Sequence, residues 1–144
     1  MSELKAIDDQ KVMDDQLSQS KSEILQIFLE EIENLRASYQ EMKESEINEP
    51  TKKEAVIASL QSLSLSTVKR SVGFLNPEGQ FIEILFQYVS ELGAAIDNIE
   101  NAYNNKEEAD IVQPTKKDAV LYPLNILWND ISEAARGLEK HTGT

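Results

Sequence analysis

The chain has 144 residues, no cysteine and a formal net charge of −12 at pH 7. Its length suits one domain with a single hydrophobic core, and the lack of cysteine excludes disulfides, thiol nucleophiles and thiolate metal sites. The acidic balance argues against nonspecific binding to nucleic acid or to anionic membranes, because lysine and arginine dominate contacts with phosphate.

The amino terminus predicts no targeting segment, because it alternates acidic and short apolar residues and lacks the basic start and apolar run of a secretory signal. The longest apolar-rich stretch, 81–89, contains Glu83 and Gln87. It is much shorter than the roughly 18 to 20 apolar residues that a membrane span requires. We therefore expect a cytoplasmic protein that does not bind membranes.

Residues 1–20 differ from the rest of the chain, since their apolar residues are sparse and pairs of aspartates at 8–9 and 14–15 crowd the same turns. This pattern predicts an N-terminal extension, either a flexible helix or an arm that becomes ordered on a partner. We expect residues 21–144 to form a single helical-bundle domain.

This domain contains an internal duplication. Residues 32–63 and 96–127, aligned at a constant offset of 64, share 13 identities in 32 positions, and the motif PTKKEAV at 50–56 returns as PTKKDAV at 114–120. A repeat of this kind defines the structural unit. We place copy one at about 22–72 and copy two at about 77–140.

The first arm of each copy predicts a long amphipathic helix, because its apolar residues recur with spacings of three and four. In copy one these residues are Leu25, Phe28, Ile32, Leu35, Tyr39 and Met42. In copy two the equivalent positions hold Val89, Leu92, Ile96, Ile99, Tyr103 and Lys106, and Phe81, Ile82, Leu85 and Phe86 extend the apolar face upstream.

Each first arm ends before a proline, Pro50 or Pro114, which disfavours helical conformation in the preceding residue. The residue after the proline is a threonine that lies three positions before a carboxylate, a spacing typical of a helix N-cap. The two pairs are Thr51 with Glu54 and Thr115 with Asp118.

A second apolar stripe follows each cap and predicts a return helix. The stripes are Val56, Leu60, Leu63, Thr67 and Val72 in copy one, and Val120, Leu124, Leu127, Ile131 and Leu138 in copy two. Pro123 should kink or restart the second return helix, because an interior proline removes a backbone hydrogen bond. Between the copies, Asn76 and Pro77 have the pattern of an N-cap and first turn for the third helix.

These elements predict an all-α fold, a four-helix bundle of two duplicated helical hairpins with pseudo-two-fold symmetry. We expect the helices to run up, down, up and down. The N-terminal extension would be added to this bundle.

No residue pattern points to catalysis or to a cofactor. Dinuclear metal sites in helical bundles use two Glu-x-x-His elements, whereas the only histidine is His141, in the tail. The chain contains neither a glycine-rich phosphate loop nor a recognisable pairing of nucleophile and base. We therefore expect a non-enzymatic protein that uses no metal and no cofactor.

The repeated lysine pairs, Lys52 with Lys53 and Lys116 with Lys117, stand at the first helical positions, where the helix dipole disfavours cations. One interpretation is solvation and salt bridging beside acidic residues of the same copy. Those residues are Glu44, Glu46 and Glu49 in copy one, and Glu107, Glu108 and Asp110 in copy two. The functional hypothesis is a pair of equivalent sites that bind an anion or an acidic partner through lysine side chains and free first-turn amides.

The first arms are strongly acidic outside their apolar stripes. The residues concerned are Glu30, Glu31, Glu33, Glu41 and Glu44 in copy one, and Glu91, Asp97, Glu100, Glu107 and Glu108 in copy two. One interpretation is that these faces keep a small bundle in solution. The other is a surface that docks onto a basic partner, by analogy with inhibitors that occupy the phosphate-binding cleft of a nuclease.

The second return helix also has two large aromatic side chains that the first lacks, because Tyr122 and Trp128 occupy the positions of Ala58 and Ser64. Aromatic residues in such helices usually pack in the core. An exposed Trp128 would instead be a candidate interface anchor, since tryptophan is enriched among binding hot spots.

The resulting functional expectation is a protein–protein interaction module, either a regulatory or adaptor subunit or part of a homo-oligomer. The alternative is an acidic inhibitor of the immunity or antitoxin type that neutralises a basic, nuclease-like partner. Direct binding to nucleic acid is not expected. The residues proposed for partner binding are Lys52, Lys53, Lys116, Lys117, Glu30, Glu31, Glu33, Glu100, Tyr122 and Trp128.

Overall fold

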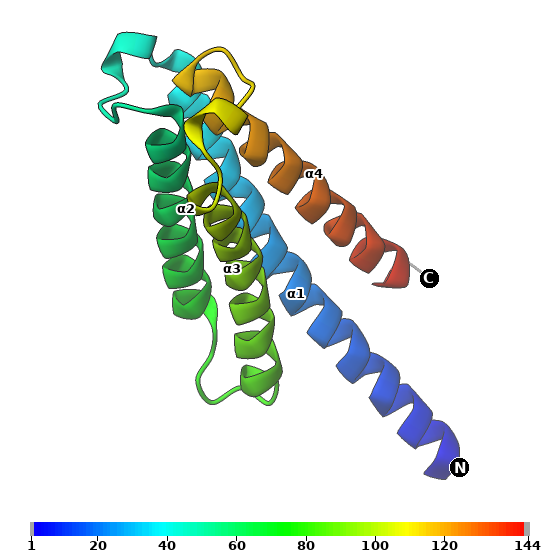
Figure 1. Cartoon of the computed structure of the whole chain (residues 1–144). Coiled ribbons are helices and arrows are strands. Elements are labelled where there is room, and N and C mark those ends of the chain that lie inside the picture. The colour runs from blue at the N-terminus through cyan, green and yellow to red at the C-terminus, as the bar shows by residue number, and fades with distance from the viewer. Residues whose placement is uncertain (1, 143–144) are drawn as a thin grey trace.

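The protein folds as a bundle of four α-helices in the computed structural model, which describes the backbone of residues 2–142 and the side chains of residues 10–139. The helices are α1 (Ser2–Glu41), α2 (Lys52–Phe74), α3 (Ile82–Asn104) and α4 (Lys116–Thr142). Two short 3-10 turns, η1 (Glu44–Glu46) and η2 (Glu108–Asp110), lie in the connections after α1 and α3. Figure 1 shows the expected up-down-up-down order. The side chain of His141 lies outside the described residues.

Helix α1 is continuous through the segment predicted as a separate extension. It has no break at residue 20, and its packing on the core starts near Leu17, which is half-buried, and Ser18, which is buried. The first turns of α1 project past the other three helices (Figure 1). The boundary at residue 20 is therefore not a boundary of secondary structure.

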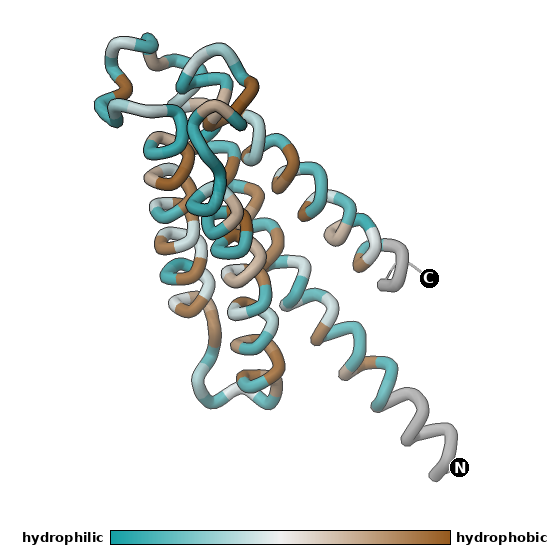
Figure 2. The backbone as a smooth tube through the Cα atoms, in the orientation of Figure 1, coloured by the Kyte–Doolittle hydropathy of each residue, from teal (hydrophilic) through white to brown (hydrophobic). Residues whose placement is uncertain are grey.

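The predicted apolar stripes form the core of the bundle. Figure 2 shows apolar residues recurring along all four helices. Side chains with 0 to 1% of their surface exposed come from every helix: Ile24, Leu25, Phe28, Ile32, Val56, Leu60, Leu63, Val89, Ile96, Val120 and Leu124. Two predicted core residues are exposed instead, Val72 at 41% and Phe86 at 52%. Phe86 flanks the stripe through Leu85 and Val89, so its ring faces outward while that stripe faces the core.

The predicted starts of the return helices are confirmed. The Thr51 hydroxyl accepts a hydrogen bond from the Glu54 amide at 3.1 Å, and the Thr115 hydroxyl accepts one from the Asp118 amide at 3.0 Å. The alanine and valine that follow in each motif are fully buried. The local sequence thus sets both the start of the helix and the face that it buries.

Two local expectations were wrong, namely a restart of α4 at Pro123 and an N-cap of α3 at Asn76. Helix α4 neither stops nor restarts at Pro123, which is buried within it, because a proline near the helix start interrupts only one of many backbone hydrogen bonds. Asn76 caps a turn rather than α3: its side-chain oxygen accepts from the Glu78 amide at 3.1 Å and its carbonyl accepts from the Gly79 amide at 2.9 Å. Helix α3 begins later, after Phe81.

The closest packing in the bundle joins the two copies of the repeat. Helix α1 packs mainly along α4, and α2 packs mainly along α3, whereas α1 and α2 touch less extensively. Figure 1 shows α2 beside α3, and α4 beside the part of α1 that lies near its C-terminal end. Each predicted hairpin is therefore held more by the other hairpin than by contacts between its own two helices.

The buried tyrosines predict a loss of stability in alkaline solution. Burial raises the pKa of Tyr39, Tyr88 and Tyr103 above the ordinary value of 10.0. Above about pH 10 the unfolded chain releases these phenolic protons first, so the folded state binds more protons and the free energy of unfolding falls as pH rises. The decline should continue until the pH passes the folded-state pKa values.

Urea unfolding followed by circular dichroism, repeated at pH values from about 8 to about 11 on either side of the ordinary tyrosine pKa of about 10, tests this expectation. Tyr39→Phe and Tyr103→Phe should flatten the alkaline slope, because each removes one of the titrating groups. A slope that is unchanged in the double variant would contradict the assignment.

Candidate interaction surfaces

The end of the bundle that contains η1 and η2 is held by two reciprocal contacts, which we call the crossed caps. The Glu108 carboxylate accepts hydrogen bonds from the backbone amides of Lys52 at 2.8 Å and Lys53 at 3.0 Å. The Glu44 carboxylate accepts from the amides of Lys116 at 2.7 Å and Lys117 at 3.2 Å. Each copy thereby caps the return helix of the other.

The crossed caps explain how the repeated lysines are tolerated at helix starts. A carboxylate at a helix N-terminus satisfies amides that have no partner within the helix, and its negative charge suits the positive end of the helix dipole. The acids that provide this charge belong to the opposite copy, so the expected pairing within one copy was wrong. The amides that the anion-binding hypothesis requires to be free are already hydrogen-bonded.

The lysine side chains also contact the opposite copy. The Lys52 ammonium donates to the Ile111 carbonyl at 3.4 Å, and the Lys116 ammonium donates to the Ile47 carbonyl at 3.5 Å. Lys117 donates to the carbonyls of Gln40 and Met42 at the end of α1, where a cation is favourable. Three of the four lysines therefore have a structural role, and the ammonium of Lys53 makes no hydrogen bond or ion pair with a described residue.

The acidic residues proposed for partner binding make contacts within the chain. Glu30 and Glu31 of α1 both pair with Arg70 of α2. Glu100 accepts a hydrogen bond from the Gln61 side chain at 2.8 Å, which joins α3 to α2. These side chains are exposed or half-buried, so they remain accessible to a partner as well.

The two aromatic candidates on α4 have different environments. Trp128 is half-buried against the core, and the guanidinium carbon of Arg36 lies 5.3 Å from the centre of its ring. Arg36 also contacts Glu33 at 3.6 Å, while its buried Nε atom has no hydrogen-bond partner among the described residues. Tyr122 is 52% exposed, and Ile126, one turn later, is 41% exposed. Tyr122 is therefore the more exposed of the two aromatic candidates.

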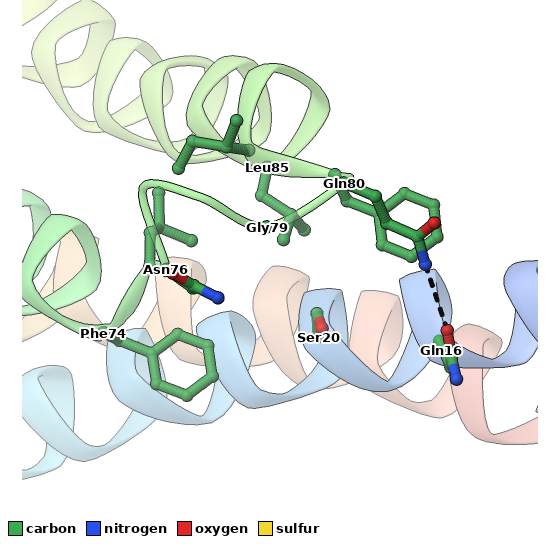
Figure 3. A pocket seen from close by; sticks show the side chains of 10 residues that line it. Gln16, Ser20, Phe74, Asn76, Gly79, Gln80 and Leu85 are labelled. Atoms are coloured by element: carbon green, nitrogen blue, oxygen red, sulfur yellow. Dashed lines mark hydrogen bonds between the residues drawn. The ribbon is translucent and has the colours of Figure 1, made fainter.

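A recess that the sequence did not indicate lies at the opposite end of the bundle, between α1 and the α2–α3 connection. Its volume is about 410 Å³. Figure 3 shows Phe74, Asn76 and Gln80 beside Gln16 and Ser20 of α1, with a hydrogen bond from Gln80 to Gln16. The Phe74 ring is 44% exposed at this site.

This recess shares lining residues with two others along α1. Gln16 and Ser20 also line a recess that extends to Val12, and Phe74 also lines one that extends to Glu30. The α1 positions that line the three recesses lie on one face of the helix: 12, 15, 16, 19, 20, 23, 26, 27 and 30. We call this surface the α1 groove, and at 1.5 Å per residue it runs for about 27 Å.

No sequence pattern predicts the α1 groove, because the groove is formed by residues from three separate segments of the chain. The contributing face of α1 is mostly polar, and Phe74 stands at the end of α2 where a core residue is also expected. The one available signal was an aromatic residue next to a connection containing Asn76, Pro77 and Gly79.

The described residues contain no cluster of three or more histidine, cysteine, aspartate or glutamate side chains arranged to hold a metal ion. Among these residues no helix is long and apolar enough to cross a membrane.

Comparisons with protein-family models, curated proteins and solved structures give no match for this chain.

Proposed function

We propose that this protein is a non-enzymatic protein–protein interaction module of the cytoplasm, a regulatory or adaptor bundle that binds a segment of its partner in the α1 groove. The observation that supports this proposal is Phe74, a large aromatic side chain that is 44% exposed and lines two of the three recesses. Exposed aromatic residues set in concave surfaces are typical anchors of protein interfaces.

The shape of the α1 groove favours a helical partner. A face about 27 Å long matches about 18 residues of α-helix. Helices that bind in grooves place apolar residues at spacings of three and four against the groove floor. Phe74, Val12 and the half-buried Phe81 would provide the apolar contacts for such a helix.

The charge of the α1 groove favours a basic partner. Its lining includes Asp15, Glu23 and Glu30, against one cation, Arg70, which already pairs with Glu30. We therefore infer an amphipathic partner helix with lysine or arginine on its polar face.

The fold that carries this groove is, in our proposal, a duplicated hairpin with pseudo-two-fold symmetry. The support is that the two caps are equivalent contacts, because Lys52 and Glu108 in one cap align, at the repeat offset of 64, with Lys116 and Glu44 in the other. The contact of Lys52 with the Ile111 carbonyl is equivalent in the same way to the contact of Lys116 with the Ile47 carbonyl. The packing pattern agrees, since exchanging the copies turns the α1–α4 pair into the α3–α2 pair. The α1 groove uses the part of α1 that precedes the aligned repeat.

A binding experiment with a defined probe tests the proposed function. The probe is a designed amphipathic helical peptide of about 18 residues with a leucine face and a lysine face, and its fluorescence anisotropy is followed as the full-length protein is added. Phe74→Ala should weaken binding by about 10-fold to 30-fold, the loss expected at an interface hot spot. Phe86→Ala is the matched control, because that phenylalanine is 52% exposed on α3 outside the α1 groove and should leave binding unchanged.

Three results would count against the α1 groove: no binding of the basic peptide, equal binding of a peptide with glutamate in place of lysine, or equal effects of the two phenylalanine variants. The acidic-inhibitor alternative has a different signature. It predicts binding that falls steeply with salt and is insensitive to Phe74→Ala, because charge rather than an apolar anchor would supply the affinity.

A further inference from the structure

The contacts between the two halves of the chain indicate a second partner, which is another copy of the same chain. Residues 10–74 and 82–139 meet through α1 with α4, through α2 with α3, and through both crossed caps. The only covalent link between these halves is the connection at 75–81. Most of what stabilises each half is therefore provided by the other half across a single interface.

We propose that the interface between the two halves can also form between two chains, so that α1 and α2 of one chain pair with α3 and α4 of a second copy. The product would be a closed dimer in which the two chains exchange halves. The packing contacts between the helices and both crossed caps would form again between chains, and only the connection at 75–81 would change its path. Exchange of identical elements is an inexpensive route to a dimer for this reason.

The crossed caps specify which halves pair in the exchanged dimer. Glu44 of one chain would cap α4 of its partner, and Glu108 would cap α2 of its partner, as each does within the monomer. The connection determines which form is favoured, because the monomer requires a tight reversal between α2 and α3. In the monomer that reversal is a turn in which the Gly79 amide donates to the Asn76 carbonyl at 2.9 Å.

Shortening the connection tests the proposal in the full chain. Deletion of residues 75–81 leaves no residue between α2 and α3 for the reversal, so the protein should change from a monomer to a dimer in light scattering, with twice the mass of the shortened chain and unchanged helical content. A shortened chain that remains a folded monomer would overturn the proposal. The proposal would also be overturned if the shortened chain that carries Glu44→Arg and Glu108→Arg formed the dimer as readily as before. That result would show that the crossed caps do not form part of the dimer interface.

A second experiment leaves the connection intact and covers the case in which the deletion variant does not fold. The Gln61 and Glu100 side chains touch at 2.8 Å between α2 and α3, and the chain has no cysteine of its own. Chains with Gln61→Cys and chains with Glu100→Cys are unfolded together, refolded at high concentration and oxidised. An exchanged dimer should give a disulfide between the two different chains.

The yield of disulfides from random collision is measured by mixing Leu65→Cys chains with Glu100→Cys chains. The native Leu65 side chain is 74% exposed on α2. The proposal predicts that Gln61→Cys chains link to Glu100→Cys chains at least about tenfold more than Leu65→Cys chains do, because effective concentration within a complex far exceeds that in solution. Equal yields for the two pairs would overturn it. Peptide binding in the α1 groove is measured separately, so either proposal can fail without the other.

Discussion

Phe28→Ala should lower the free energy of unfolding by about 3–5 kcal/mol, the loss typical of a large aromatic side chain removed from a packed core. The Phe28 side chain is fully buried in α1, within the cluster that joins all four helices. The substitution removes the transfer free energy of the ring and also leaves a cavity that the surrounding helices can only partly fill.

The repeat provides a matched control for this prediction. Leu92 occupies the position in copy two that Phe28 occupies in copy one, but it is only half-buried at the edge of the core. Leu92→Ala should therefore cost less, about 1–2 kcal/mol, because less apolar surface returns to water. Two positions that are equivalent in the repeat would thus differ about twofold or more in their effect on stability.

Urea unfolding followed by circular dichroism measures both variants. The free energy of unfolding of a domain this size is about 5–15 kcal/mol, so Phe28→Ala should strongly lower the urea concentration at the unfolding midpoint. The slope of the free energy of unfolding against urea concentration should stay similar. Equal losses for the two substitutions would show that the two copies bury these positions to the same extent, contrary to the structure.

The features that the sequence predicted correctly are those set by neighbours within one or two helical turns. Thr51 and Thr115 cap their helices because the hydroxyl and the amide that it accepts from are three residues apart. The apolar stripes likewise follow from spacings of three and four. These relations do not depend on how the helices are later arranged, so they can be read from the sequence alone.

The crossed caps were missed for the opposite reason. Glu44 lies close in sequence to Lys52, yet it caps the helix that starts at Lys116, 72 residues away from it along the chain. Proximity in sequence favoured pairing within one copy, whereas the fold pairs each acid with the other copy. The identity of Glu44 and Glu108 in the aligned repeat was the available signal, but an acid in an acidic chain does not stand out.

The α1 groove could not be predicted, because it exists only after α1, the end of α2 and the connection at 75–81 come together.

The exposure of Phe86 could not be predicted for a related reason. Its position beside Leu85 suggested a wide buried face on α3, while the bundle buries a narrower one. Which flank of a helix stays exposed depends on the angle at which its neighbours approach, and periodicity does not contain that angle.

Replacing both Glu44 and Glu108 with alanine should lower the free energy of unfolding by about 2–4 kcal/mol, from about 1–2 kcal/mol for each cap. Each carboxylate accepts two backbone amides at 2.7–3.2 Å, and without it the first turns of α2 and α4 keep unpaired donors next to two lysines. Because the two caps share no residue, the single losses should add.

Glu41→Ala is the control for charge alone. The chain carries a net charge of −12, so removing any carboxylate relieves some repulsion, and Glu41 stands at the C-terminal end of α1 where the helix dipole disfavours a negative charge. This substitution should therefore be neutral or slightly stabilising. If Glu44→Ala and Glu108→Ala behave like Glu41→Ala in urea unfolding, the crossed caps contribute nothing to stability.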